Sequence, residues 1–180
     1  LAAFYVETTD YQRAIHLCRR ALDYRSDHAP ALVNLGSALY QSGETDKALE
    51  IFRKLLKVQP NSWKAALGLA QSYQRLGKIN EAIIAYKRVV SLTPNVAEAH
   101  FELGAHYFNR GEFGEAAESF RNVLRLSPDF LPARMALARS YAKTEQYDQA
   151  IQEYRHTLSL YPDNDEARSR LKSLLERRRQ

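Results

Sequence analysis

The chain has 180 residues, of which 45% are hydrophobic and 26% are charged, so it can bury a core and is not expected to be disordered. Its 7 glycines and 6 prolines are too few for the frequent tight turns of a β-sandwich or β-barrel, which favours an all-α protein. The net charge of +5 is uneven, because residues 165–180 hold six basic and three acidic residues and the rest carries only +2. Nucleic acid is therefore disfavoured as a partner, since binding it needs a clustered basic stripe.

The single cysteine, Cys18, excludes an intrachain disulfide and a zinc site built from cysteines. No apolar run approaches the roughly 18 residues that a membrane helix needs, so no membrane span is expected. The first ten residues lack the pattern of a signal peptide, and the sequence assigns no compartment.

Prolines recur at intervals of 34 residues, at Pro60, Pro94, Pro128 and Pro162. Alanines keep the same interval without exception, at Ala14, Ala48, Ala82, Ala116 and Ala150. Large apolar residues do so too, at Leu35, Leu69, Leu103 and Leu137 and at Cys18, Phe52, Tyr86, Phe120 and Tyr154. Agreement between several independent positions indicates an internal repeat.

Each repeat is predicted to be a helical hairpin. Leu103 and Tyr107 share one face of a first helix, and a turn is expected at residues 109–112. Ala116 and Phe120 then follow at helical spacing on a second helix, which ends before the recurring proline. A hairpin this short cannot bury its own apolar face, so stacking of neighbouring hairpins must supply the core.

This pattern resembles the tetratricopeptide repeat, whose L-G-x-x-Y, A-x-x-x-F and P positions are matched by Leu103, Gly104, Tyr107, Ala116, Phe120 and Pro128. The resemblance implies a right-handed superhelical solenoid of antiparallel helix pairs. One departure concerns a bulky position early in the first helix, where Leu32 of one repeat is replaced by Arg134 in a later one. We expect looser packing near the ends of the chain, where such departures occur.

The family's frame gives the elements in chain order. Residues 1–28 match the last part of a repeat, four full repeats follow, and residues 165–180 form an extra helix; all belong to one solenoid domain. The full repeats span 29–62, 63–96, 97–130 and 131–164. The last helix either caps the solenoid or begins a further repeat. Because Leu1 already falls in the middle of a predicted helix, we expect the sequence to be a fragment of a longer chain.

Signatures of catalysis are absent, because the sequence has no glycine-rich phosphate loop, no H-E-x-x-H and no C-x-x-C. The five histidines are too dispersed for metal chelation, and Cys18 is expected to be buried and inert. We therefore predict that the protein is not an enzyme and needs neither a metal nor a cofactor.

In the resembling family, one side of each first helix lines a concave groove. Apolar residues fall on this side, and Ala105 between Phe101 and Phe108 predicts an open depression. Polar residues on the same side complete the candidate groove. The candidates are Val33, Asn34, Tyr40, Leu67, Gln71, Arg75, Phe101, Ala105, Phe108, Asn109, Met135, Arg139 and Lys143. If these candidates bind a partner, we expect Phe101 and Met135 to face away from the core. The alternative is that the apolar candidates pack against neighbouring helices.

The function implied is a non-catalytic scaffold, within a larger protein or assembly, that binds another protein through an extended peptide or an amphipathic helix. One alternative is a targeting or regulatory module of an enzyme whose catalytic domain lies outside this sequence. A weaker alternative is an RNA-binding helical repeat. Self-association stays open.

Overall fold

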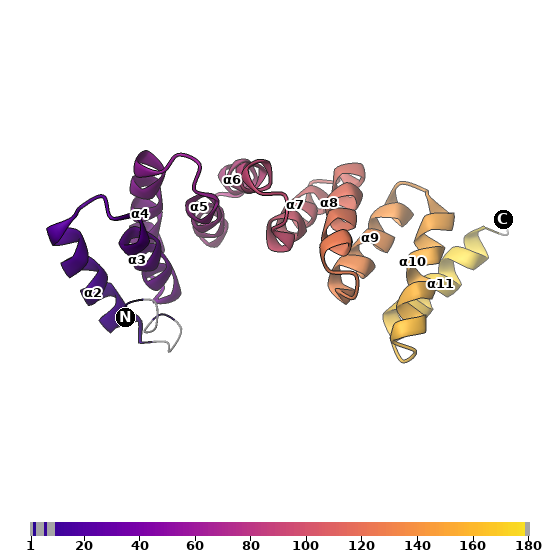
Figure 1. Cartoon of the computed structure of the whole chain (residues 1–180). Helices are drawn as coiled ribbons and strands as arrows, with labels where there is room; N and C mark the ends of the chain where they lie inside the picture. The colour runs from indigo at the N-terminus through magenta and orange to yellow at the C-terminus, as the bar shows by residue number, and fades with distance from the viewer. Residues whose placement is uncertain (1, 3–5, 7–9, 179–180) are drawn as a thin grey trace. The chain divides into compact units, whose positions relative to one another are not determined.

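The computed structural model describes residues 2, 6 and 10–178, and these form helices with no strand (Figure 1). Two compact units divide the chain, the first ending at Pro94 and the second beginning at Asn95. The predicted all-α class is confirmed. Part of the predicted partial repeat 1–28 and the last two residues of the predicted helix 165–180 lie outside the described residues.

In each unit, consecutive helices pack against one another. The helices of the first unit are α2 (Tyr11–Tyr24), α3 (Ala29–Gln41), α4 (Thr45–Val58), α5 (Trp63–Arg75) and α6 (Ile79–Leu92). Those of the second unit are α7 (Ala97–Asn109), α8 (Phe113–Leu126), α9 (Leu131–Lys143), α10 (Tyr147–Leu160) and α11 (Asp165–Arg177). The first helices of neighbouring pairs are also in contact: α3 contacts α5, and α7 contacts α9. Side chains on one face of these helices therefore lie within reach of one another.

The turns between paired helices recur with the sequence interval. Gly43, Gly77 and Gly111 have positive φ angles of 89°, 71° and 79°, which glycine adopts without steric cost. Glu145 holds the fourth of these positions with φ 60°, so a side chain accepts a left-handed backbone there. The geometry of the turn is thus kept even where its glycine is missing.

Small residues allow the paired helices to pack closely. The five alanines at the 34-residue interval are all 0% exposed, as expected of residues at tight helix crossings. At three glycines on the first helices, an aromatic ring from the second helix of a pair packs against the backbone. Gly36 and Gly68 both lie against the Phe52 ring, and Gly104 lies against the Phe120 ring.

Replacing Gly68 by alanine is expected to lower the free energy of unfolding by about 1 to 3 kcal/mol. A Cβ atom there would lie 2.3 Å from the Phe52 ring, and that ring cannot retreat because Gly36 closes its other side. Urea denaturation measures the change. The control is Gly114→Ala on α8, where a Cβ meets open space and the better helix former should stabilise by up to about 1 kcal/mol. Equal losses in the two variants would contradict this packing.

Candidate functional site

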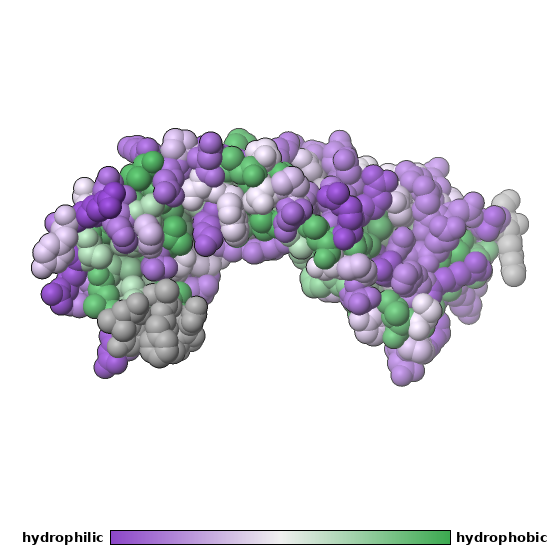
Figure 2. Space-filling model, in the orientation of Figure 1, coloured by the Kyte–Doolittle hydropathy of each residue, from purple (hydrophilic) through white to green (hydrophobic). Residues whose placement is uncertain are grey.

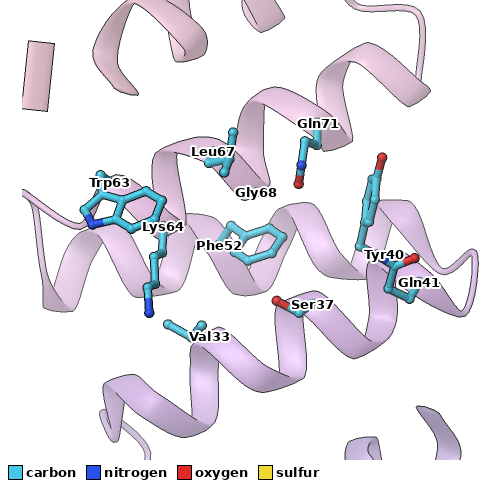
Figure 3. A pocket seen from close by; sticks show the side chains of 10 residues that line it. All are labelled: Val33, Ser37, Tyr40, Gln41, Phe52, Trp63, Lys64, Leu67, Gly68 and Gln71. Atoms are coloured by element: carbon cyan, nitrogen blue, oxygen red, sulfur yellow. The ribbon is translucent and has the colours of Figure 1, made fainter. Parts of the chain in front are cut away.

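The first unit has a cavity of about 230 Å³ between α3, α4 and α5. We call it the Phe52 hollow, because that ring lies at its centre, with Leu67 on one side and Val33 on the other (Figure 3). Four predicted groove residues line it: Val33, Tyr40, Leu67 and Gln71. Its other lining residues are Ser37, Gln41, Phe52, Trp63, Lys64 and Gly68.

Two predicted groove residues of the first unit, Asn34 and Arg75, do not line the Phe52 hollow. The Arg75 guanidinium instead stacks on the Tyr40 ring, 3.6 Å from its centroid, and donates a hydrogen bond to the Tyr40 carbonyl. This contact ties the end of α5 to the end of α3. Arg75 therefore holds the rim of the hollow by fixing Tyr40.

The second unit has a larger cavity of about 500 Å³, which we call the aromatic hollow. It gathers six predicted groove residues: Phe101, Ala105, Phe108, Asn109, Met135 and Arg139. Its other lining residues are Phe120, Leu131, Pro132, Ala136, Asn164 and Glu166. The half-buried Ala105 contributes only a methyl group between the rings of Phe101 and Phe108, as the predicted depression requires. The surface in Figure 2 alternates between hydrophobic and hydrophilic patches in both units.

The expectation that Phe101 and Met135 face away from the core is wrong. Met135 is only 9% exposed and belongs to a buried cluster with Tyr154, while Phe101 packs edge-on against Phe120 and Phe130 with ring centroids 5.7 and 5.4 Å away. Both residues also line the aromatic hollow. The reason is that the wall of this hollow is the outer surface of the core itself. The same side chains therefore pack in the core and line the hollow.

A second cavity of about 500 Å³ lies between α9, α10 and α11, and we call it the basic hollow. Lys143, the remaining predicted residue of this unit, lines it. Its other lining residues are Phe108, Arg139, Ala142, Tyr154, Arg170, Ser173, Leu174 and Arg177. The α11 residues were missed by sequence reasoning, although Ser173 and Arg177 lie 34 residues after Arg139 and Lys143. Extending the repeat interval into the last helix would have found them.

Burial shifts the pKa values of Tyr154, His106 and Cys18 in the direction that favours the neutral form of each side chain. Burial raises the pKa of the Tyr154 phenol, an effect opposed by the positive charges of Arg170 and Arg139. Burial lowers the pKa of His106, against the opposing charge of Glu102. Burial also raises the pKa of Cys18, and the prediction that this cysteine is buried is confirmed.

Within the part of the chain that the structure describes, no three His, Cys, Asp or Glu side chains gather as a metal site would require. None of the described helices combines the length and apolar character needed to cross a membrane. Of the cavities on the described surface, the Phe52 hollow and the aromatic hollow are lined mainly by apolar side chains, whereas four cations help to line the basic hollow. A groove continuous over both units stays a prediction.

Comparisons with known proteins agree with the repeat. Two family models described as tetratricopeptide repeat match residues 67–130 and 107–175, and one described as anaphase-promoting complex, cyclosome, subunit 3 matches residues 7–89. No curated protein sequence matches the chain significantly.

Solved structures share the fold. The protein MamA is 22% identical over 88% of this chain and 87% of its own, with a TM-score of 0.77. YrrB, described as a tetratricopeptide protein with an unusual peptide-binding site, is 23% identical over 95% of this chain and 88% of its own, also at 0.77. A thermophilic tetratricopeptide protein of Thermus thermophilus, TTC0263, is 26% identical over 97% of this chain and 95% of its own, with a TM-score of 0.63. The chain therefore belongs to the tetratricopeptide repeat family, and its fold is the family's all-α solenoid of antiparallel helix pairs.

Proposed function

We propose that this protein is a non-catalytic scaffold that binds an extended peptide or an amphipathic helix of a partner protein in the hollows of its first helices. Membership of the tetratricopeptide family supports a role in protein interaction. The peptide-binding site described for YrrB, a protein of the same fold, supports a peptide as the ligand. A scaffold of this kind acts within a larger protein or assembly.

The observation that carries the proposal is the aromatic hollow. Its volume of about 500 Å³ falls in the range of about 300 to 1,000 Å³ that is typical of ligand sites. Phe101 and Phe108 are only partly buried, so their rings present apolar area that a partner side chain can cover. Aromatic residues, together with methionine and arginine, are enriched at protein interfaces.

Truncating Phe101 or Met135 cannot separate binding from folding, because both support the core. Ala105 offers a cleaner test. Replacing it by leucine fills the depression between the two rings without removing any packed atom, and leucine is a good helix former. The proposal is therefore tested by blocking the hollow rather than by emptying it.

Ala105→Leu is expected to weaken binding of peptides selected from a random displayed library by about 10-fold or more, with the melting temperature nearly unchanged. The matched control is Ala21→Leu on α2, an exposed alanine outside all three hollows, which should change neither quantity. Fluorescence anisotropy gives the affinities and circular dichroism the melting temperatures. The proposal fails if no peptide binds, or if peptides bind Ala105→Leu as tightly as they bind the natural chain.

A further inference from the structure

We propose that the partner segment bound by the second unit is acidic as well as apolar, and that its carboxylates enter the basic hollow while its apolar side chains enter the aromatic hollow. This inference rests on the proposed peptide-binding function and specifies the chemistry of the peptide. It follows from the charges of the basic hollow, from the way its cations are held, and from its position beside the aromatic hollow.

Four cationic side chains and no carboxylate line the basic hollow; the cations are Arg139 and Lys143 from α9 and Arg170 and Arg177 from α11. Only Arg170 has a carboxylate within 4 Å among the described residues, that of Glu166 at 3.8 Å. All four side chains are exposed. Four positive charges around one concave surface create a field that attracts an anionic ligand.

Three of these cations are held in place by aromatic rings rather than by acids. The Arg139 guanidinium lies 4.9 Å from the centroid of the Phe108 ring, and the Arg177 guanidinium lies 5.7 Å from that of Tyr147. The Lys143 ammonium lies 5.9 Å from the Phe113 ring. A cation over a ring face is positioned without being neutralised, so its charge and its N–H donors remain available to a ligand.

The basic hollow shares Phe108 and Arg139 with the aromatic hollow, so the two cavities adjoin. One bound segment can therefore reach both. Glu166 lines the aromatic hollow, where it would repel an acidic side chain, whereas no carboxylate lines the basic hollow. Charge thus directs acidic side chains to the basic hollow and apolar ones to the aromatic hollow.

The Phe52 hollow of the first unit lacks this character. Lys64 is the only charged residue among those that line it, and its ammonium lies 5.8 Å from the Trp63 ring. A preference for acidic peptides is accordingly expected of the second unit alone. The two units would then recognise different stretches of partner sequence.

The test compares two synthetic peptides of about 12 residues, which span roughly 40 Å when extended. Both carry leucine or phenylalanine at alternate positions, and the positions between hold glutamate in one peptide and glutamine in the other. The full chain is titrated with each peptide by calorimetry. The probe variant is Lys143→Gln with Arg177→Gln, which removes two charges from the basic hollow and none from the lining of the aromatic hollow.

The control variant is Arg121→Gln with Arg155→Gln, which removes the same charge from exposed positions of α8 and α10 outside the hollows. We expect the natural chain to bind the glutamate peptide about 10-fold more tightly than the glutamine peptide. That preference should disappear in the probe variant and persist in the control. It should also fall when the ionic strength rises from about 0.1 to about 1 M, which shortens the Debye length from about 10 to about 3 Å.

Equal affinity of the natural chain for both peptides would overturn this inference and leave the proposed function standing. Binding of neither peptide would count against the proposed function and this inference together. A uridine oligonucleotide of equal charge serves as a third ligand. If it binds more tightly than the glutamate peptide and loses affinity in the probe variant, the basic hollow recognises nucleic acid, and the acidic peptide is excluded.

Discussion

Replacing Phe52 by alanine is expected to lower the free energy of unfolding by about 3 to 5 kcal/mol. The ring is only 3% exposed and lies between Gly36 and Gly68, which carry no side chains that could move into the vacated space. The loss therefore combines the buried apolar area of the ring with the cavity that remains. Because the ring is also the centre of the Phe52 hollow, the variant should lose any peptide binding in the first unit.

Urea denaturation followed by circular dichroism measures this change, and Phe130→Ala serves as a control. Phe130 is 40% exposed, so its removal should cost much less. A further variant tests the glycine contact directly: in the Phe52→Ala background, Gly68→Ala should no longer be destabilising, because the ring it would strike is absent. A Phe52→Ala protein no less stable than the Phe130→Ala protein would disprove the assigned packing.

Replacing Arg134 by alanine is expected to lower the free energy of unfolding by about 2 to 3 kcal/mol. The Arg134 side chain is 9% exposed; its Nη1 donates to Glu153 Oε2 at 2.8 Å, and its Nη2 donates to the Pro128 carbonyl. Removing the guanidinium leaves a carboxylate on α10 and a backbone carbonyl without this partner. The Glu153 side chain is 24% exposed, so water partly offsets the loss.

Arg25→Ala is the control for the Arg134 variant. Arg25 pairs with Asp27 at 3.1 Å, but both side chains are well exposed, so little stability should be lost. A double-mutant cycle with Glu153→Gln isolates the coupling between Arg134 and Glu153. If Arg134→Ala costs no more than Arg25→Ala, the buried pair does not stabilise the last helices of the second unit.

The repeat and its helices could be read from the sequence, because the forces that set them are local. Helix spacing is fixed by the backbone, and turns are fixed by the few residues within them. The alanines at the 34-residue interval are all fully buried, and Gly43, Gly77 and Gly111 have positive φ angles, as does Glu145 at the next position of their own 34-residue interval. The alanine period therefore marked the helix crossings, and the turn expected at residues 109–112 does contain the positive-φ Gly111.

Sequence spacing, together with the resemblance to the tetratricopeptide family, also predicted which side of the first helices lines the hollows. Phe101, Ala105 and Phe108 do line one cavity, because a helix turns by about 100° per residue and these three residues recur on one side. Residue spacing predicts the side of the helix on which a side chain lies, but not how deeply that side chain is buried. Met135 was expected on an outer face, but it belongs to a buried cluster that also holds Tyr154 of α10 and Leu174 of α11.

Only the tertiary structure decided which distant side chains meet. Phe52 lies 16 residues from each of the two glycines that hold it, and Arg139 joins Arg170 from a helix that comes two elements later. Such contacts depend on how side chains of different helices fill the space between them, which no spacing within one helix records. The sequence by itself therefore determined the family, the helices and the side of the first helices that lines the hollows, whereas packing between helices formed the hollows and gathered the four cations into one of them.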